Sequence, residues 1–132
     1  MKKPIAIIAG EPNSISSEII FKSWKLRKRY NHKPIFVIGS TELLDMQKKK
    51  LKQKIKIKEI TKNFKIDELN GNELPVYNVK YNQKKDFQKI STKSNNYIFK
   101  CFDIALNFIK DRKISGFINC PISKESLFKN NH

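Results

Sequence analysis

The stretch that decides the fold is PIAIIAG, residues 4–10, near the start of a chain of 132 residues. An isoleucine-rich run of this length that ends at a glycine is typical of a fully buried strand in a parallel sheet. The next residues, 11–14, are turn formers, and Ser14 or Ser16 can cap a helix. Glu18 then falls in the first turn of that helix, where the helix dipole favours an anion. Strand, turn and helix in this order predict the first unit of an α/β fold.

The same order of elements continues to residue 60. A second apolar run at residues 35–38 ends at Gly39, and Ser40 or Thr41 can cap the helix that follows. A third strand is expected at residues 55–60, where lysine and isoleucine alternate. Crossovers of this length imply parallel strands in a layered fold. The apolar faces of the two helices are expected to consist of Ile15, Ile19, Ile20 and Trp24 in the first and Leu43, Leu44, Met46 and Leu51 in the second.

The rest of the chain continues this pattern after a less regular middle. Residues 74–79 are typical of a strand, and the polar residues 81–90 indicate a loop. Residues 92–112 are helical in pattern and apolar on so many sides that the helix is expected to be buried on more than one face. Another buried strand is expected at 114–120, and a last helix at 124–130 that Ser123 can cap. The fold class predicted is α/β, a layered α/β/α arrangement with a mostly parallel sheet.

The charge of the chain allows a second interpretation. The 28 Lys and Arg residues outnumber the 12 Asp and Glu residues, and the formal net charge is +16. A basic nucleic-acid-binding α/β module would have such a charge, with the lysines of residues 48–58 as its best support. However, isoleucine, lysine and asparagine all have AT-rich codons, only three residues are arginine, and residues 48–58 contain no aromatic side chain for stacking on bases. We therefore attribute the positive charge to a drift of the composition toward AT-rich codons, and we expect the lysines of residues 48–58 to lie on a solvated face.

Several other classes of protein are disfavoured by the sequence. Two cysteines, Cys101 and Cys120, supply neither a disulfide framework nor a zinc site made from cysteine alone. Apolar runs are too short to cross a membrane, and Glu11 interrupts the opening run before it reaches the length of a signal peptide. A cytoplasmic protein without a membrane partner is therefore expected. No Walker-type glycine loop supports a kinase or phosphotransferase, and Cys120 has no evident histidine partner as a nucleophile.

Candidate site residues follow two of the predicted strands. Ligands of parallel α/β sheets bind beyond the carboxyl ends of the strands. Residues 10–14 follow the first strand and offer Glu11 and Asn13, whereas residues 119–124 follow the last predicted strand and offer Lys124. The alternative is that Glu11 and Asn13 are turn or cap residues and that Lys124 is solvated. His32 and His132 are expected to be solvated or structural, so no metal ligand is assigned.

These two segments resemble those of a known family. The run Gly10-Glu11-Pro12, followed by Ile15 and Glu18, resembles the opening of 4-hydroxythreonine-4-phosphate dehydrogenases. Residues 114–124 resemble a strand of that family that ends in a small residue, a proline, an aliphatic residue, a variable residue and a lysine. Pro121 and Lys124 match this pattern. Ser14, Ser16 and Ser17 stand where the family usually has Gly, Gly and Pro, and serine at these positions can still cap a helix.

The resemblance implies an enzyme larger than this chain. It implies a homodimeric, NAD-dependent oxidoreductase that oxidises 4-phosphooxy-L-threonine, a small phosphorylated amino acid. Decarboxylation then gives 3-amino-2-oxopropyl phosphate, in the biosynthesis of pyridoxine 5'-phosphate. The family also implies a fold similar to isopropylmalate dehydrogenase and a divalent metal (zinc, magnesium or cobalt) held by histidines of two subunits.

Residues 1–132 would then be the N-terminal part of a two-domain dehydrogenase. Under this interpretation Glu11, Asn13 and Lys124 belong to the substrate cleft. The family's metal ligands and its His-Thr substrate motif are not present in this chain. No catalytic or cofactor-binding residue is assigned within it, and the chain alone is expected to be inactive.

Overall fold

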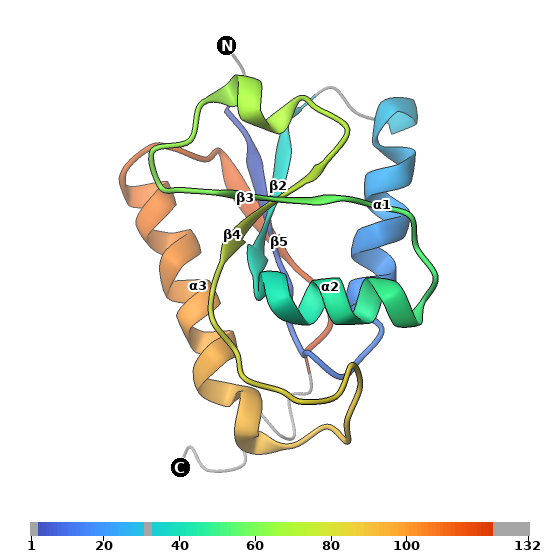
Figure 1. Ribbon diagram of the computed structural model, residues 1–132. Helices are drawn as coiled ribbons and strands as arrows, with labels where there is room; N and C mark the ends of the chain where they lie inside the picture. Colours follow the sequence, from blue (N-terminus) through green and yellow to red (C-terminus); the bar gives the residue numbers. More distant parts are fainter. Residues whose placement is uncertain (1–2, 31–32, 123–132) are drawn as a thin grey trace.

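A computed structural model describes residues 3–30 and 33–122 of the chain (Figure 1). The elements alternate between strands and helices, as predicted. They are β1 (Ile5–Ile8), α1 (Ser16–Tyr30), β2 (Ile35–Gly39), α2 (Thr41–Lys50), β3 (Ile57–Ile60), the 3-10 helix η1 (Ile66–Leu69), β4 (Leu74–Asn78), the 3-10 helix η2 (Thr92–Ser94), α3 (Asn95–Lys110) and β5 (Gly116–Asn119). The predicted cap at Ser123 and helix at 124–130 lie outside the described residues.

The strands form one five-stranded sheet in the order β3-β4-β2-β1-β5. Every pairing is parallel, with Ile7 of β1 opposite Val37 of β2 on one side and Ile118 of β5 on the other. The carboxyl ends of all five strands therefore lie on the same side of the sheet, which we call its carboxyl edge. This arrangement confirms the predicted α/β class with a parallel sheet.

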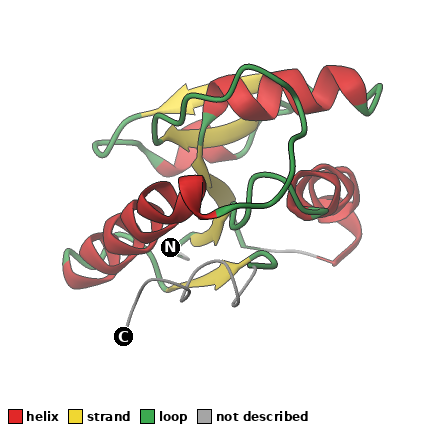
Figure 2. Cartoon of the chain, turned by 90° about the horizontal axis from the view of Figure 1, so that it is seen from below, coloured by secondary structure: helices red, strands yellow, loops and turns green. Residues whose placement is uncertain are grey.

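Helices cover both faces of the sheet, because the side chains of a strand point alternately to its two faces (Figure 2). On one face, Phe36 and Ile38 of β2 pack in a cluster with Ile98, Cys101 and other residues of α3. On the other face, Val37 packs with residues of α1 and α2. The layers are thus α3, sheet, and α1 with α2. Among the described residues, no helix has both the length and the apolar character needed to cross a membrane.

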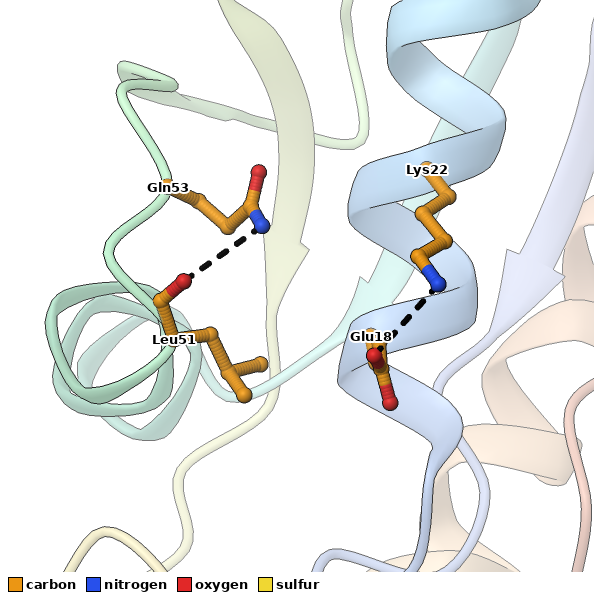
Figure 3. Close-up of polar contacts among 4 residues, drawn as sticks. All are labelled: Glu18, Lys22, Leu51 and Gln53. Atoms are coloured by element: carbon orange, nitrogen blue, oxygen red, sulfur yellow. Dashed lines mark hydrogen bonds and ion pairs between the residues drawn. The ribbon is translucent and has the colours of Figure 1, made fainter.

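The first helix differs in part from its predicted apolar face. Ile20 and Trp24 are buried as expected, and Phe21 joins them, but Ile15 and Ile19 are exposed. Ile15 precedes Ser16, the first helical residue, so the periodicity of the helix does not determine which way Ile15 faces. Glu18 lies in the first turn as predicted and pairs with Lys22 at 3.4 Å (Figure 3).

The second helix begins where the sequence predicts. Ser40 is its N-cap, and the Ser40 hydroxyl accepts a hydrogen bond from the backbone N–H of Leu43. Met46 is only half-buried, and Gln47 takes the buried position on that face instead. Beyond the helix, the Gln53 side chain donates to the carbonyl oxygen of Leu51 at 3.4 Å (Figure 3).

The lysine-rich segment 48–58 includes the end of α2, the connection to β3 and the start of β3. Ile55 and Ile60 are buried, whereas Lys52, Lys54 and Lys56 are exposed. Lys48 and Lys49 pair with Asp45 at 3.1 and 3.2 Å. Lysines that alternate with core isoleucines in this way lie on the solvated side of a strand and of the residues that lead into it.

The last predicted strand, residues 114–120, is buried only in part, contrary to the sequence interpretation, because Ile114 and Cys120 are buried but the residues between them are half-buried or exposed. Among the described residues, β5 lies at an edge of the sheet and has β1 as its one neighbour, and Ile118 is 60% exposed. The burial predicted for α3 is also only partly correct, because Phe99, Leu106 and Ile109 are exposed. An apolar strand looks the same in sequence whether it has one neighbour or two, so the local pattern could not distinguish an edge from a centre.

Candidate functional site

The loops that follow β1 and β5 meet at the carboxyl edge of the sheet. The backbone N–H of Glu11 donates to the carbonyl oxygen of Pro121 at 3.0 Å, and the Ser16 hydroxyl donates to the same oxygen at 3.2 Å. Two segments at opposite ends of the chain are thus joined, as the positions of their strands predict. Lys124 lies outside the described residues, so its place in the site stays a prediction.

Gly10 makes this close approach of the two loops possible. Its φ is +74°, in the left-handed region that side chains rarely adopt. A Cβ atom at this position would lie 2.7 Å from the Pro121 carbonyl oxygen and 2.8 Å from that of Cys120. The glycine that ends the decisive apolar run is therefore required by both its conformation and its neighbours.

Glu11 is buried at the centre of the junction, with 1% of its surface exposed. Its carboxylate accepts a hydrogen bond from the Asn13 backbone N–H at 3.2 Å and another from the Ser94 hydroxyl at 3.3 Å. Burial raises the pKa of Glu11, and the hydrogen bonds from Asn13 and Ser94 oppose this shift. The pKa of Tyr81 is also raised, by burial and by the nearby charge of Glu11. A carboxyl that protonates more easily than usual is therefore fixed between the β1–α1 loop and the start of α3.

Asn13 connects the junction to the polar loop at residues 81–90. Its side-chain amide exchanges two hydrogen bonds with that of Gln83, at 3.1 and 2.8 Å. The Asn13 side-chain oxygen also accepts from the backbone N–H of Gln88 at 2.7 Å. Every polar atom of the Asn13 side chain is therefore engaged in holding this loop. Whether Asn13 and Glu11 also contact a substrate stays a prediction.

Gln47 also supports the loops of the candidate site, and the sequence interpretation did not include it. Its side-chain nitrogen donates to the carbonyl oxygens of Pro12 and Asp86, at 2.6 and 2.8 Å. Through these bonds α2 supports both the β1–α1 loop and the loop at residues 81–90. A signal was present, because Gln47 follows Leu43 and Leu44 at core spacing, and a polar residue on a core face requires buried partners.

Ser14 and Ser16, which stand where the family that the sequence resembles usually has glycine, form the turn with their hydroxyls. Ser14 donates to the Glu11 carbonyl oxygen at 3.0 Å and accepts from the backbone N–H of Ser16 at 3.1 Å. Neither Ser14 nor Ser16 has a positive φ, so this turn does not need glycine at these positions. The Ser17 hydroxyl is buried without a hydrogen-bond partner among the described residues.

Tyr97 of α3 supports the neighbouring strand end and was not singled out as a site residue from the sequence. Its hydroxyl oxygen accepts a hydrogen bond from the backbone N–H of Ser40, 2.8 Å away, in a buried environment. Its ring stacks on that of Tyr81, with ring centroids 4.8 Å apart. The end of β2, the polar loop and α3 are thereby joined beside Glu11.

The two cysteines do not have the properties of nucleophiles. Burial raises the pKa of Cys101 to about 12 and that of Cys120 to about 11. Since the thiolate is the reactive form, both side chains are inert near neutral pH. Within residues 3–30 and 33–122, no cluster of three or more His, Cys, Asp or Glu side chains could hold a metal ion. The described residues therefore do not supply a donor set that fits a metal ion.

A surface cavity of about 540 Å³ lies next to this junction, beside α2 and β3. Ser40, Asn78 and Tyr81 line its end nearest the carboxyl edge, and the Asn78 side chain accepts from the Thr41 backbone N–H at 3.0 Å. Its walls carry carboxylates and lysines in mixed order, including Asp45 and Lys48, which pair with each other. The cavity is therefore a charged surface depression and does not include Glu11 or Asn13.

Comparisons with known proteins identify a family and curated relatives. A family model described as pyridoxal phosphate biosynthetic protein PdxA matches residues 31–132. A 4-hydroxythreonine-4-phosphate dehydrogenase from Zymomonas mobilis is 24% identical over 127 residues, which are 96% of this chain and 36% of that protein. A relative from Oceanobacillus iheyensis, which carries the provisional name D-threonate 4-phosphate dehydrogenase, is 26% identical over 99% of this chain and 40% of its own length.

Solved structures show the same fold. A 4-hydroxythreonine-4-phosphate dehydrogenase from Burkholderia phymatum superposes with a TM-score of 0.84 at 18% identity, over 100% of this chain and 40% of that one. The enzyme of that name from Klebsiella pneumoniae gives a TM-score of 0.78 at 20% identity, over 99% of this chain and 41% of that one. The chain thus spans about two-fifths of the length of the proteins it matches.

Proposed function

Because the chain belongs to the PdxA family of pyridoxal phosphate biosynthetic proteins, we propose that it is the N-terminal part of a two-domain, NAD-dependent dehydrogenase. The proposed substrate is 4-phosphooxy-L-threonine, which would be oxidised and then decarboxylated to 3-amino-2-oxopropyl phosphate. The observation that carries the proposal is the junction of Glu11 and Pro121, which joins the two family-like loops at the carboxyl edge of the sheet. This edge is where parallel α/β sheets bind their ligands.

The residues of the junction would shape one wall of the substrate cleft. Glu11 and Asn13 would hold the β1–α1 loop and the loop at residues 81–90 in position, through their bonds to Ser94 and Gln83. Lys124, three residues after Pro121, would supply a positive charge for the anionic substrate. NAD would accept the hydride, and the divalent metal and its ligands would come from parts of the enzyme beyond this chain. A homodimer in the cytoplasm is proposed on the same grounds.

D-threonate 4-phosphate is the second candidate substrate. It is suggested by the name of the Oceanobacillus iheyensis relative, whose 26% identity is as high as that of the relatives named for 4-hydroxythreonine 4-phosphate. Both compounds are phosphorylated, hydroxylated four-carbon acids, and they differ in that only 4-phosphooxy-L-threonine carries an amine. Residues that recognise the amine would decide between them.

An assay of NAD reduction tests the proposal in two steps. The chain of 132 residues, supplied with either substrate and with zinc or magnesium, should give no turnover; clear turnover would contradict the assignment as part of a larger enzyme. The nucleotide sequence past the codon for His132 should then be read and the longer protein expressed. Turnover of 4-phosphooxy-L-threonine above that of D-threonate 4-phosphate supports the first candidate, and the reverse order supports the second. An inactive longer protein with both substrates would contradict the proposed function.

The role of Lys124 is tested in the same longer protein. Lys124→Ala should raise KM for the phosphorylated substrate, because it removes the charge that faces the anion. The matched control is Lys93→Ala, in the short helix η2, which should leave KM unchanged. An unchanged KM and kcat in Lys124→Ala would remove this residue from the site.

A further inference from the structure

Another surface cavity, of about 200 Å³, lies where α1 ends and β2 begins. We call it the α1–β2 cavity. Among the described residues, the charged side chains that line it are all cations, namely Arg27, Lys28 and Lys33. The cavity beside α2 and β3 differs, because its walls mix lysines with carboxylates. A depression whose charges all have one sign attracts a ligand of the opposite sign.

The α1–β2 cavity and the junction of Glu11 and Pro121 lie at opposite ends of the strands. Ile35, which lines the cavity, is the first residue of β2, whereas Gly39, the last residue of β2, lies at the carboxyl edge. In Figure 1 the end of α1 is at the top of the molecule and the β1–α1 loop is at the bottom. A ligand in the α1–β2 cavity would therefore not contact the residues of the junction.

Arg27 is held in a fixed position beside the α1–β2 cavity. Its guanidinium carbon lies 3.8 Å from the centroid of the Trp24 ring, and its Nη1 donates to the Trp24 carbonyl oxygen at 2.7 Å. Its Nη2 donates to the carbonyl oxygen of Gly71 at 3.4 Å. An arginine has five N–H groups, so three of those of Arg27 have no acceptor within residues 3–30 and 33–122. A guanidinium held in this way loses little freedom when it binds an anion.

The positive charge of Arg27 has no carboxylate partner in the part of the chain that the structure describes. Burial lowers the pKa of Arg27, and no negative charge opposes this shift. The negative end of a helix dipole amounts to about half an elementary charge, whereas the last turn of α1 carries three cations, Arg27, Lys28 and Arg29. The positive charge beside the cavity therefore exceeds what the end of α1 requires.

Drift of the composition does not account for this group of residues. AT-rich codons explain an excess of lysine, but the chain has only three arginines, and two of them lie in the last turn of α1. Trp24 is the only tryptophan of the chain, and Arg27 stacks on its ring. Rare residue types that meet at one cavity indicate a specific role.

We propose that the α1–β2 cavity binds a phosphate group, either as inorganic phosphate or as part of a small phosphate monoester. Arg27 supplies a planar fork of donors and Lys28 a point charge, and both are common ligands of phosphate in proteins. Pro34, Ile35 and Leu69, which also line the cavity, offer an apolar wall to the carbon chain of a monoester. The proposal is independent of the proposed function, because it uses no residue of the junction.

Fluorescence of Trp24 provides the test of binding. Since this is the only tryptophan and Arg27 stacks on it, an anion that binds Arg27 should change its emission. The full chain of 132 residues is titrated with inorganic phosphate, with glycerol 3-phosphate and with glycerol, while sodium chloride keeps the ionic strength constant. Both phosphates should give a saturable change, and glycerol should give none. Tighter binding of glycerol 3-phosphate assigns the cavity to a monoester, and tighter binding of inorganic phosphate assigns it to the free anion.

Lys28→Glu and Lys100→Glu distinguish the cavity from the general charge of the chain. Both substitutions reverse one exposed charge on a helix, but Lys28 lines the cavity, whereas Lys100 lies on α3, which covers the other face of the sheet. Lys28→Glu should raise the Kd for phosphate about ten-fold, and Lys100→Glu should leave it within about two-fold. Arg27→Gln should abolish binding, as measured by isothermal titration calorimetry, because this variant also loses the ring contact that reports binding.

Two results would overturn the phosphate site. One is the absence of a saturable change with either phosphate. The other is an equal effect of Lys28→Glu and Lys100→Glu on the Kd, which would show that phosphate binds only to the general positive charge of the chain.

Discussion

The backbone N–H of Glu11 lies 3.0 Å from the carbonyl oxygen of Pro121 and donates a hydrogen bond to it. This bond joins the loop after the first strand to the loop after the last described strand. Because β1 and β5 are parallel neighbours, the two loops leave the sheet at the same edge. The backbone can approach so closely only because residue 10 has no side chain.

Gly10→Ala should therefore destabilise the protein. The left-handed backbone alone costs an alanine about 1–2 kcal/mol, and its Cβ would add a clash with two backbone carbonyls, 2.7 and 2.8 Å away. Urea unfolding followed by circular dichroism measures the loss. Gly71→Ala is the control, since the nearest atom to its Cβ is 4.0 Å away, and it should change the free energy of unfolding by less than about 0.5 kcal/mol. Equal stability of Gly10→Ala and the wild type would contradict the close approach of the loops.

Glu11→Gln should make the protein relatively more stable as pH rises. Burial raises the pKa of Glu11 in the folded state above 4.5, its ordinary value. The stability that the protonated carboxyl contributes is complete below the unfolded pKa and is lost as pH rises through the folded pKa. Glutamine stays neutral and keeps an acceptor for the Asn13 N–H, so its free energy of unfolding relative to the wild type should increase between about pH 4 and about pH 7.

The same pH series with Ser94→Ala provides the control for Glu11. Loss of the Ser94 hydroxyl removes a hydrogen bond that favours the carboxylate, so the decline in stability with pH should become steeper. In the Glu11→Gln background, Ser94→Ala should have an effect that does not depend on pH. A difference between Glu11→Gln and the wild type that is constant over the whole range would refute the raised pKa.

Asn13→Ala should loosen the loop at residues 81–90 without unfolding the sheet. The substitution removes the paired amide bonds to Gln83 and the acceptor for the Gln88 backbone N–H. Hydrogen exchange read by mass spectrometry should show faster exchange in residues 81–90 and unchanged exchange in β1 and β2. Gln88→Ala is the matched control, because its exposed side chain is removed while its backbone N–H remains. Faster exchange in both variants alike would show that the Asn13 amide does not hold the loop.

Much of the fold follows from local sequence, and the exceptions have physical reasons. Runs such as residues 4–9 and 35–38 are apolar, short and bounded by turn residues, so their strands were found within a residue or two. Exposure of Ile118 was missed because the number of neighbouring strands is a property of the whole sheet. Exposure of apolar residues of α3 was missed for the same reason, since helical periodicity shows that a face is apolar but does not show what covers it.

The position of the candidate residues Glu11 and Asn13 in the fold was predictable from the sequence, but their contacts were less so. The order of strands and turns placed Glu11 and Asn13 at the carboxyl edge of the sheet, together with the segment of Pro121. Their partners Ser94 and Gln83 come from distant segments of irregular structure, whose position depends on tertiary packing. Only Gln47 left a local signal, as a polar residue in a row of buried leucines.

Tyr97→Phe should destabilise the protein although it removes a single oxygen. The buried N–H of Ser40 would lose its acceptor, 2.8 Å away, and an unpaired buried donor costs about 1–3 kcal/mol. Tyr77→Phe provides the control, because the Tyr77 hydroxyl makes no hydrogen bond within the part of the chain that the structure describes, and should cost less than about 0.5 kcal/mol. Urea unfolding of both variants measures the difference. Equal losses would show that the bond to Ser40 contributes nothing specific.

Cys101 and Cys120 should resist alkylation in the folded protein. Burial raises their pKa to about 12 and about 11, so the reactive thiolate is scarce near neutral pH, and both side chains are also shielded from the reagent. Iodoacetamide should label neither cysteine in native buffer and both in concentrated urea, as read by mass spectrometry of the peptides that contain Cys101 and Cys120. Rapid labelling of Cys120 alone in native buffer would show that the β5 loop opens beside Glu11, and it would restore Cys120 as a candidate nucleophile. Labelling of both cysteines at equal rates would instead indicate global unfolding, which the urea midpoint of the same sample measures independently.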